Sequence, residues 1–231
     1  MDFQTALENK GIILSEKQLN QFERYYQLLV EWNEKMNLTA ITDHDDVYLK
    51  HFLDSLTISF DYDFNNQSIV DVGAGAGFPS IPLKIVYPEL QITIVDSLGK
   101  RITFLNHLVQ ELDLDHVEAI HARAEEFAIK HREAFDIATA RAVARLNILD
   151  ELCMPLVKVG GDFLVLKGLQ GDIELKEASK GIEKLGGKIV KDVAFTLTDE
   201  NDHRHNLIIH KVKNTPAKYP RAFGQIKKKP L

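Results

Sequence analysis

The stretch Ile69-Val70-Asp71-Val72-Gly73-Ala74-Gly75-Ala76-Gly77-Phe78-Pro79 decides the fold. It starts as a short β-branched run, continues through three alternating glycines and ends where a helical pattern begins. Glycine lets the chain turn tightly and lets a ligand approach bare backbone. This order of strand, glycine turn and helix predicts an α/β sheet that binds a ligand at the carboxyl end of its first strand.

Asp71 indicates which ligand that turn accepts. An acid beside the loop disfavours an anionic pyrophosphate but can face a positively charged amine, and S-adenosylmethionine carries both an ammonium and a sulfonium. The spacing Gly73-x-Gly75-x-Gly77 also departs from the G-x-G-x-x-G of dinucleotide sites. The loop therefore favours a methyl donor, bound by Asp71 and the three glycines, over a nicotinamide cofactor. A purely structural glycine turn is the competing interpretation.

Short β-rich runs alternate with helical stretches after residue 68, which predicts βαβ units. The predicted strands are Ser68–Val72, Gln91–Val95, Val117–Ile120, Phe135–Thr139, Asp162–Leu166, Lys188–Phe195 and Asn206–Val212. The predicted helices are Ile81–Tyr87, Lys100–Leu112, Ala124–Lys130, Leu146–Val159 and Asp172–Leu185. Only the polar link Thr196–His205 joins the last two strands, so they should pair antiparallel. Five parallel strands and a terminal hairpin predict the α/β fold of class I S-adenosylmethionine-dependent methyltransferases, a Rossmann-like sheet of seven strands.

The first 62 residues read as a helical extension packed on that core. Ser15-Glu16-Lys17-Gln18 is a capping box. Two apolar stripes follow it at helical spacing: Leu19, Phe22, Tyr26, Leu29 and Val30, and then Leu49, Leu53, Leu56 and Phe60. We therefore expect an extension at 1–62, a methyltransferase domain at 63–213 and a basic tail at 214–231.

Further candidate donor residues follow the second and third strands. Asp96 ends the second strand about 20 residues after the loop, where an acid usually binds the ribose hydroxyls. Ala124 and Glu125 follow the third strand, against which the adenine lies in this fold. Asp96 can instead cap the next helix, and the acids after Arg123 can simply favour a helix start.

The fourth and fifth strands end in Arg141 and Lys167, which should lie at the mouth of the site. Arg141 can meet a phosphate, a carboxylate or a base face, and it is the candidate for orienting the acceptor. No covalent nucleophile is expected, because Cys153 lies mid-helix outside any C-x-x-C motif. A guanine N7 would suit such a site, since its lone pair attacks without a base. His203 and His205 lack further ligands nearby, so no metal is expected.

Composition and charge limit the possible cellular locations and binding partners of the protein. The chain begins without a positive n-region or an apolar h-region, has one cysteine and has no apolar run near the ~18 residues that span a bilayer. We therefore expect a cytoplasmic protein without membrane contact. The net charge is −6, but residues 203–231 contribute +8 and the rest carries −14. The basic end is either a solvated tail or an RNA-binding segment.

Two N-terminal motifs and the tail carry a family resemblance. Trp32-Asn33-Glu34-Lys35-Met36-Asn37-Leu38-Thr39-Ala40-Ile41 matches W-N-x-x-x-N-L-T-A-I, and His51-Phe52-Leu53-Asp54-Ser55-Leu56 matches H-x-x-D-S-L. Asp96-Ser97-Leu98-Gly99-Lys100-Arg101, Arg141-Ala142 and Tyr219-Pro220-Arg221 follow in order. The chain thus resembles, nearly end to end, the bacterial 16S ribosomal RNA guanine-N7 methyltransferases of the RsmG family, also called GidB. In the tail, Ala222 and Ile226 depart from its pattern.

The resemblance implies donor contacts at Gly73, Phe78, Ala124, Glu125 and Arg141. It also implies methylation of one guanine N7 in the decoding-region loop of 16S rRNA, whether naked or in the small subunit. RNA contacts are then expected from the following residues: Lys167, Arg221, Lys227, Lys228 and Lys229. No obligate protein partner is indicated, which suits a monomer. His51 and Asp54 serve either the acceptor or helix packing. A methyltransferase for small molecules, a nicotinamide-dependent oxidoreductase and a non-catalytic RNA-binding factor are the alternatives.

Overall fold

The computed structural model describes residues 2–141, 143–198 and 202–231; Ala142 and part of the predicted link Thr196–His205 lie outside the described residues. The strands are β1 (Ser68–Val72), β2 (Gln91–Asp96), β3 (Val117–His121), β4 (Phe135–Arg141), β5 (Val157–Lys167), β6 (Gly187–Thr196) and β7 (His203–Lys211). The helices of the sheet domain are α5 (Ser80–Val86), α6 (Gly99–Glu111), α7 (Ala124–Lys130), α8 (Leu146–Cys153) and α9 (Gly171–Lys184).

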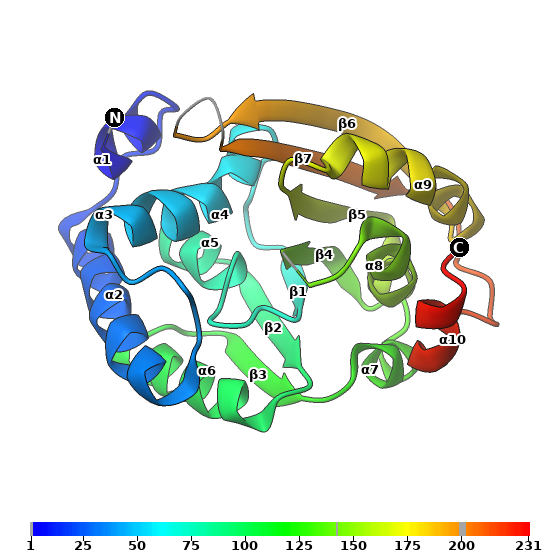
Figure 1. Ribbon diagram of the computed structural model, residues 1–231, viewed down its shortest axis with the longest axis horizontal. Helices are drawn as coiled ribbons and strands as arrows, with labels where there is room; N and C mark the ends of the chain where they lie inside the picture. The colour runs from blue at the N-terminus through cyan, green and yellow to red at the C-terminus, as the bar shows by residue number, and fades with distance from the viewer. Residues whose placement is uncertain (1, 142, 199–201) are drawn as a thin grey trace.

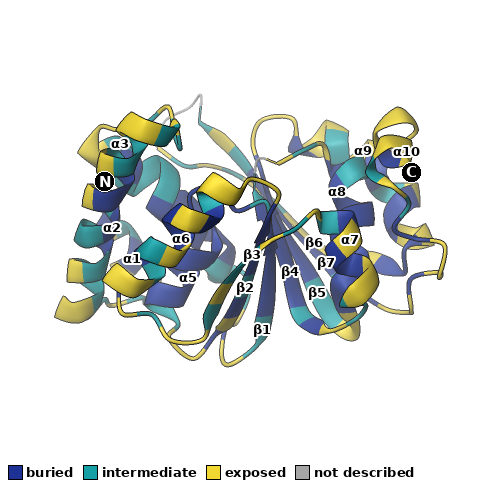
Figure 2. Cartoon of the chain, turned by 90° about the horizontal axis from the view of Figure 1, so that it is seen from below, coloured by how far each residue is buried: buried dark blue, intermediate teal, exposed yellow. Residues whose placement is uncertain are grey.

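The strands form one sheet in the order β3-β2-β1-β4-β5-β7-β6 (Figure 1). Strands β1 to β5 are parallel, whereas β7 runs antiparallel to both β5 and β6. Viewed along its edge, the sheet separates two layers of helices, with α5 and α6 on one side and α7, α8 and α9 on the other (Figure 2). The predicted class I methyltransferase fold, with its terminal hairpin, is therefore confirmed.

The N-terminal extension packs on the α5–α6 side of the sheet. Its helices are α1 (Phe3–Glu8), α2 (Glu16–Met36), α3 (His44–Val47) and α4 (Asp54–Leu56), with a π-helical segment η1 (Tyr48–Leu53) and a 3₁₀ turn η2 (Thr57–Phe60). The capping box is present: the Ser15 hydroxyl accepts from the Gln18 N–H, and the Gln18 side chain accepts from the Ser15 N–H.

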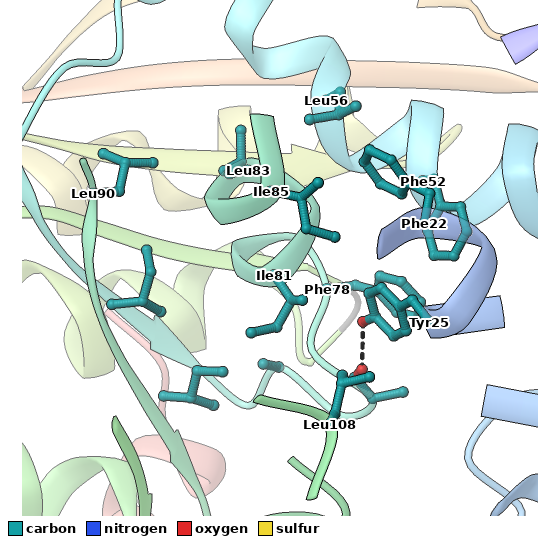
Figure 3. Close-up of a cluster of buried hydrophobic side chains, with 14 of the residues drawn as sticks. Phe22, Tyr25, Phe52, Leu56, Phe78, Ile81, Leu83, Ile85, Leu90 and Leu108 are labelled. Atoms are coloured by element: carbon teal, nitrogen blue, oxygen red, sulfur yellow. Dashed lines mark hydrogen bonds between the residues drawn. The ribbon is translucent and has the colours of Figure 1, made fainter. Parts of the chain in front are cut away.

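The buried tyrosine of α2 is Tyr25 rather than Tyr26, a correction to the predicted stripe. Tyr25 is fully buried among aromatic residues of η1 and of the glycine loop, and its hydroxyl donates to the Ala76 carbonyl at 2.6 Å (Figure 3). Its ring stacks on Phe78 at 5.5 Å between centroids. The extension thus supports the glycine loop from beneath.

The predicted helix Leu146–Val159 is too long. Helix α8 ends at Cys153, a 3₁₀ turn η3 (Met154–Leu156) follows, and β5 already begins at Val157. Pro155 explains the difference, because proline lacks the N–H that would donate to the carbonyl four residues earlier and continue the α-helix. The extra residues lengthen β5 at the amino end, away from the predicted site.

The segment after β7 returns to the core and contains α10 (Phe223–Lys228), which packs near α8 (Figure 1). Tyr219 and Ile226 are buried in the cluster on the α8 side of the sheet. Among the described residues no helix is both long and apolar enough to cross a bilayer.

Candidate functional site

A cavity of about 440 Å³ opens at the carboxyl ends of β1 and β2. Its wall is formed by the glycine loop, by Asp96 at the end of β2, by Arg101 in α6 and by residues 122–125 beyond β3. This is the place where open α/β sheets bind ligands. Most of the predicted donor residues meet here, with Gly73, Gly75, Phe78, Asp96, Ala124, Glu125 and Arg141 all lining the cavity.

The glycines of the loop serve different purposes. Gly75 has a φ of +61°, and a side chain placed there would meet no atom within 4 Å, so its backbone borders open space. Gly77, with a φ of +103°, does not line the cavity; a Cβ there would lie 2.7 Å from the Tyr25 hydroxyl. Gly75 therefore exposes backbone to a ligand, whereas Gly77 lets α2 approach the loop.

Asp71 lies beneath the loop rather than in the cavity wall. It is fully buried, and its Oδ2 accepts from the Ser80 N–H at 3.2 Å. Its Oδ1 has no hydrogen-bond partner among the described residues. Burial raises the pKa of Asp71 to about 7, because the ionised form loses its hydration. The carboxyl group thus ties the loop to the start of α5.

Asp96 is buried and reaches the cavity from the end of β2. Its Oδ1 accepts from the Leu98 N–H at 2.9 Å, and its Oδ2 accepts from Arg101 Nη1 at 3.2 Å. The bond to Leu98 closes a turn immediately before α6, whose N-cap residue is Leu98. A carboxylate has about four acceptor positions, so the same group retains capacity for the hydroxyls of a ribose.

Ala124 and Glu125 form the first turn of α7 and border the cavity beyond β3. Glu125 is buried, and its Oε1 lies 3.8 Å from Arg123 Nη1. Acids in a first turn also favour the helix itself. The position of Glu125 therefore suits both a contact with the adenine and a role in favouring the start of α7.

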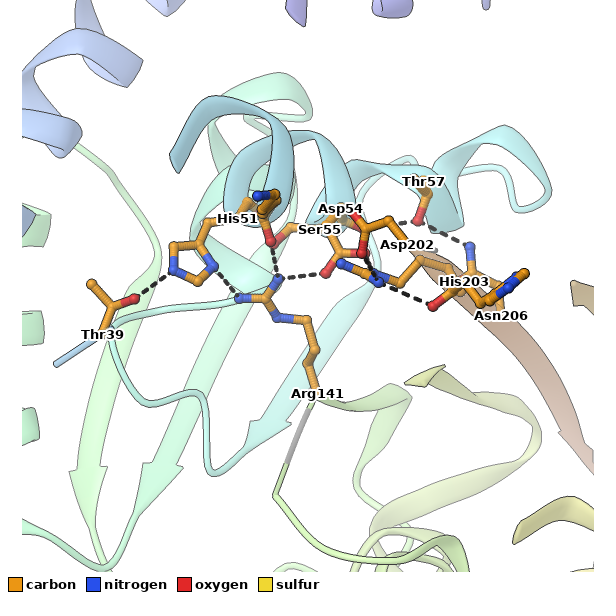
Figure 4. A network of polar contacts seen from close by, with 11 residues as sticks. Thr39, His51, Asp54, Ser55, Thr57, Arg141, Asp202, His203 and Asn206 are labelled. Atoms are coloured by element: carbon orange, nitrogen blue, oxygen red, sulfur yellow. Dashed lines mark hydrogen bonds and ion pairs between the residues drawn. The ribbon is translucent and has the colours of Figure 1, made fainter. Parts of the chain in front are cut away.

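Arg141 stands at the centre of a polar network that the sequence predicted only in part (Figure 4). Its Nη1 donates to Asp54 at 2.7 Å, and its Nη2 donates to His51 Nδ1 at 3.3 Å. The guanidinium carbon lies 4.7 Å from the centre of the Phe78 ring. Asp54 also accepts from Arg204 Nε at 2.7 Å. One carboxylate thus holds two arginines from β4 and β7.

His51 is a neutral member of this network. Burial, reinforced by the charge of Arg141, lowers the pKa of His51 to about 4. Because arginine only donates, Nδ1 must accept, so Nε2 carries the proton and donates to Thr39 Oγ1 at 2.7 Å. Thr39 is fixed in turn, since its N–H donates to Asn33 Oδ1 at 2.8 Å. His51 is therefore placed to position Arg141.

This chain of contacts explains the first N-terminal motif, whose roles the sequence did not give. Asn33 and Thr39 belong to it, and Asn37 ends α2 in the left-handed conformation at a φ of +49°. Thr39 and Arg204 were not predicted as site residues. Thr39 could have been predicted, because it belongs to the motif. Arg204 contributes to the sequence analysis only as one of the positive charges in residues 203–231.

A second cavity of about 540 Å³ adjoins the first, and His51, Arg141 and Val143 line both. The wall of the second cavity also includes Asp54, Lys167 and Arg204. Lys167 is buried, and its Nζ lies 2.5 Å from the Ala144 carbonyl and 2.9 Å from Glu174. Its charge is therefore already paired.

The basic tail is divided between paired and exposed cations. The Arg221 side chain and N–H both donate to the buried Glu151 carboxylate, at 2.5 to 3.1 Å. The following residues are exposed: Lys227, Lys228 and Lys229. Phe223, which precedes them in α10, lines the first cavity and was missed in the sequence.

Two reactive groups are engaged elsewhere. Cys153 is buried, and burial raises the pKa of its thiol, so it is not a poised nucleophile. His205 contacts Asp172 through Nδ1 and Asp192 through Nε2. The structure thus brings two carboxylates to His205 that the sequence analysis did not associate with it, and the three residues form a group whose potential metal-ligand atoms lie within 4.8 Å of one another. His203 is exposed at the start of β7.

The comparisons with known proteins agree with this geometry. The family described as GidB, rRNA small subunit methyltransferase G, matches residues 18–206. A ribosomal RNA small subunit methyltransferase G from Lysinibacillus sphaericus is 57% identical, covering 99% of this chain and 98% of its own. One from Macrococcus caseolyticus is also 57% identical, covering 100% and 98%.

The chain belongs to the rRNA small subunit methyltransferase G family. Its fold also resembles solved structures at low identity. An S-adenosylmethionine-dependent methyltransferase from Aquifex aeolicus aligns with a TM-score of 0.56 at 14% identity, over 72% of this chain and 93% of its own. A precorrin-6y C5,15-methyltransferase from Geobacter metallireducens aligns with a TM-score of 0.52 at 18% identity, over 69% and 88%.

Membership of the methyltransferase G family confirms the predicted enzyme class and its donor, S-adenosylmethionine. The residues that line the first cavity suit the chemical groups of that donor. Bare backbone at Gly75 leaves room for an amino-acid end, the buried Asp96 carboxylate suits hydroxyl donors, and Ala124 and Phe223 offer apolar surface for a purine.

Proposed function

We propose that this protein transfers a methyl group from S-adenosylmethionine to N7 of one guanine in 16S ribosomal RNA. The observation that carries the proposal is the pair of adjoining cavities at the carboxyl edge of the sheet, which share His51 and Arg141 in a common wall. The family and its near relatives are described as acting on small-subunit ribosomal RNA, which supports the substrate.

We assign the donor to the first cavity. Asp96 binds the ribose hydroxyls, the backbone at Gly73 and Gly75 borders the amino-acid end, and Ala124 with Glu125 borders the adenine. When bound, S-adenosylmethionine supplies a methyl group on a positively charged sulfur. Asp71 contributes from below, by holding the loop through the Ser80 N–H.

We assign the target guanine to the second cavity. Its N7 has a free lone pair, so the protein need not remove a proton before attack, and catalysis rests on position and orientation. His51 fits this view, because both of its ring nitrogens are occupied and it stays neutral near pH 7. Arg141 orients the base and supplies positive charge, while His51 and Asp54 position Arg141.

We assign the RNA backbone contacts to the exposed lysines of the tail, Lys227, Lys228 and Lys229. Arg221 is paired with Glu151, and Lys167 is paired with Glu174. We therefore propose that these two residues contribute to the RNA-binding surface mainly by shaping it, because their charges are already balanced. The work would be done in the cytoplasm by a monomer, on rRNA or on the small subunit.

The test is transfer of a labelled methyl group to small-subunit rRNA that lacks the modification, offered both naked and as assembled particles. Digestion to nucleosides should place the label in 7-methylguanosine. The matched control is the same rRNA already methylated at that site, which should accept none. Label in another nucleoside would refute the N7 assignment, and binding of rRNA without any transfer would refute catalysis.

A further inference from the structure

The C-terminal segment 214–231 is anchored to the core along its length. The Arg132 guanidinium donates to the carbonyls of Thr215 and Tyr219. Thr215 donates its N–H to Glu133 at 2.9 Å. Further along, Ile226 is fully buried against the α8 side of the core. The segment is therefore not a free basic tail.

Arg221 is the strongest of these anchors, because its partner Glu151 is fully buried in α8. The Arg221 N–H and guanidinium together satisfy both Glu151 oxygens. A buried carboxylate needs such a partner, since an unpaired charge in the interior is strongly unfavourable. This ion pair fixes the chain immediately before α10.

The anchor directs Phe223, the first residue of α10, to the wall of the first cavity. Ala122, Ala124 and Leu152 line the same cavity and belong with Phe223 to the hydrophobic cluster on the α8 side of the sheet. Ala122 and Ala124 follow β3 and so lie on the β3 side of Asp96, whereas Leu152 comes from α8. A donor whose ribose meets Asp96 and whose amino-acid end follows the glycine loop must place its flat purine on this side.

We propose that Phe223 is a donor-binding residue and that the Arg221–Glu151 ion pair is the positioning element that holds it against the adenine. The tail then has two faces: its lysines lie on the outside, and its aromatic residue completes the donor cavity. The inference rests on the donor placement proposed above. It predicts that donor affinity depends on a segment that composition alone assigns to RNA.

The test is calorimetric titration of the full-length protein with S-adenosylhomocysteine and with 5′-methylthioadenosine, which lacks the amino-acid end. Phe223→Ala should weaken both ligands by a similar factor, about tenfold, because both carry the adenine. Phe223→Tyr should restore most of the affinity. Gln225→Ala, an exposed change in the same helix, is the matched control and should bind both ligands like the wild type.

A second variant keeps the proposal testable if Phe223→Ala unfolds. Arg221→Gln removes the anchor without touching the cavity wall, and it should also weaken both ligands. Its effect and that of Phe223→Ala should be less than additive in the double variant, since both act through one contact. Wild type that binds neither ligand would refute the donor site itself. Wild type that binds, with folded Phe223→Ala or Arg221→Gln equally tight, would refute only this inference.

Discussion

The Asp54 carboxylate accepts a hydrogen bond from Arg141 Nη1 at 2.7 Å, although 87 positions separate the two residues in the chain. Its other oxygen holds Arg204 at the same distance. The contact joins the N-terminal extension to the carboxyl edge of the sheet, where the two cavities meet. It therefore makes the extension part of the site.

Asp54→Asn should lower the rate of methyl transfer at least about tenfold and leave the affinity for S-adenosylhomocysteine nearly unchanged. Two arginines would lose their shared counter-charge, so the free energy of unfolding should also fall, by about 2–4 kcal/mol. Single-turnover kinetics and chemical denaturation measure these effects. Asp202→Asn is the control, because Asp202 contacts Arg204 but not Arg141. Equal rate losses in both variants would contradict the role given to Arg141.

Asp96→Ala should weaken binding of S-adenosylhomocysteine by about 1–3 kcal/mol, the cost of leaving buried hydroxyl donors without an acceptor. Titration calorimetry at constant pH provides the measurement. Glu118→Ala, an exposed change on the neighbouring strand β3, serves as the control. If Asp96 only holds the turn before α6, the melting temperature will fall while the ligand binds as before.

Replacing Lys227, Lys228 and Lys229 together by alanine should raise the KM for RNA and leave the affinity for S-adenosylhomocysteine unchanged. Each lost phosphate contact reduces the slope of log affinity against log salt by about 0.7–0.9. A salt series of RNA-binding titrations tests this. The matched control removes equal charge from the exposed residues Lys180, Lys184 and Lys188. An unchanged slope would mean that the tail does not contact the RNA backbone.

The free energy of unfolding should depend on His51 between pH 6.5 and pH 4. The pKa of His51 is lowered to about 4 in the folded protein, below its unfolded value. The stability contributed by neutral His51 is therefore complete above about pH 6.5 and is lost as the pH falls toward 4. Denaturation of wild type at pH 7.5 and pH 5 should show a loss that is larger, by about 2 kcal/mol, than in His51→Gln. Parallel pH profiles for the two proteins would contradict the buried, uncharged histidine.

Much of the fold could be predicted from local patterns, because each strand of the sheet corresponds to a separate apolar run in the sequence. The start of β5 could not, since the run after Leu146 suits helix and strand equally and only Pro155 distinguishes them. The predicted apolar stripe included Tyr26 in place of Tyr25. The two positions lie about 100° apart on the helix, but both carry a tyrosine, so residue type could not show which one faces the core.

The site divides in the same way. The glycine loop, Asp96 and Arg141 were predictable, because each ends a strand at the same edge of the sheet. The pairing of Asp54 with Arg204 was not, since it depends on how β7 enters the sheet. Phe223 was missed for a similar reason: its position follows from the anchoring of Arg221 on Glu151, a contact between distant segments.

The place of β7 also has a consequence for biosynthesis. Because it lies between β5 and β6, the last strand made is an interior one, and β6 has no neighbour in the sheet until β7 arrives. Strand β7 must therefore be synthesised before the sheet can close and Arg204 can reach Asp54. The site for rRNA methylation would thus be assembled only after every strand of the sheet has been synthesised.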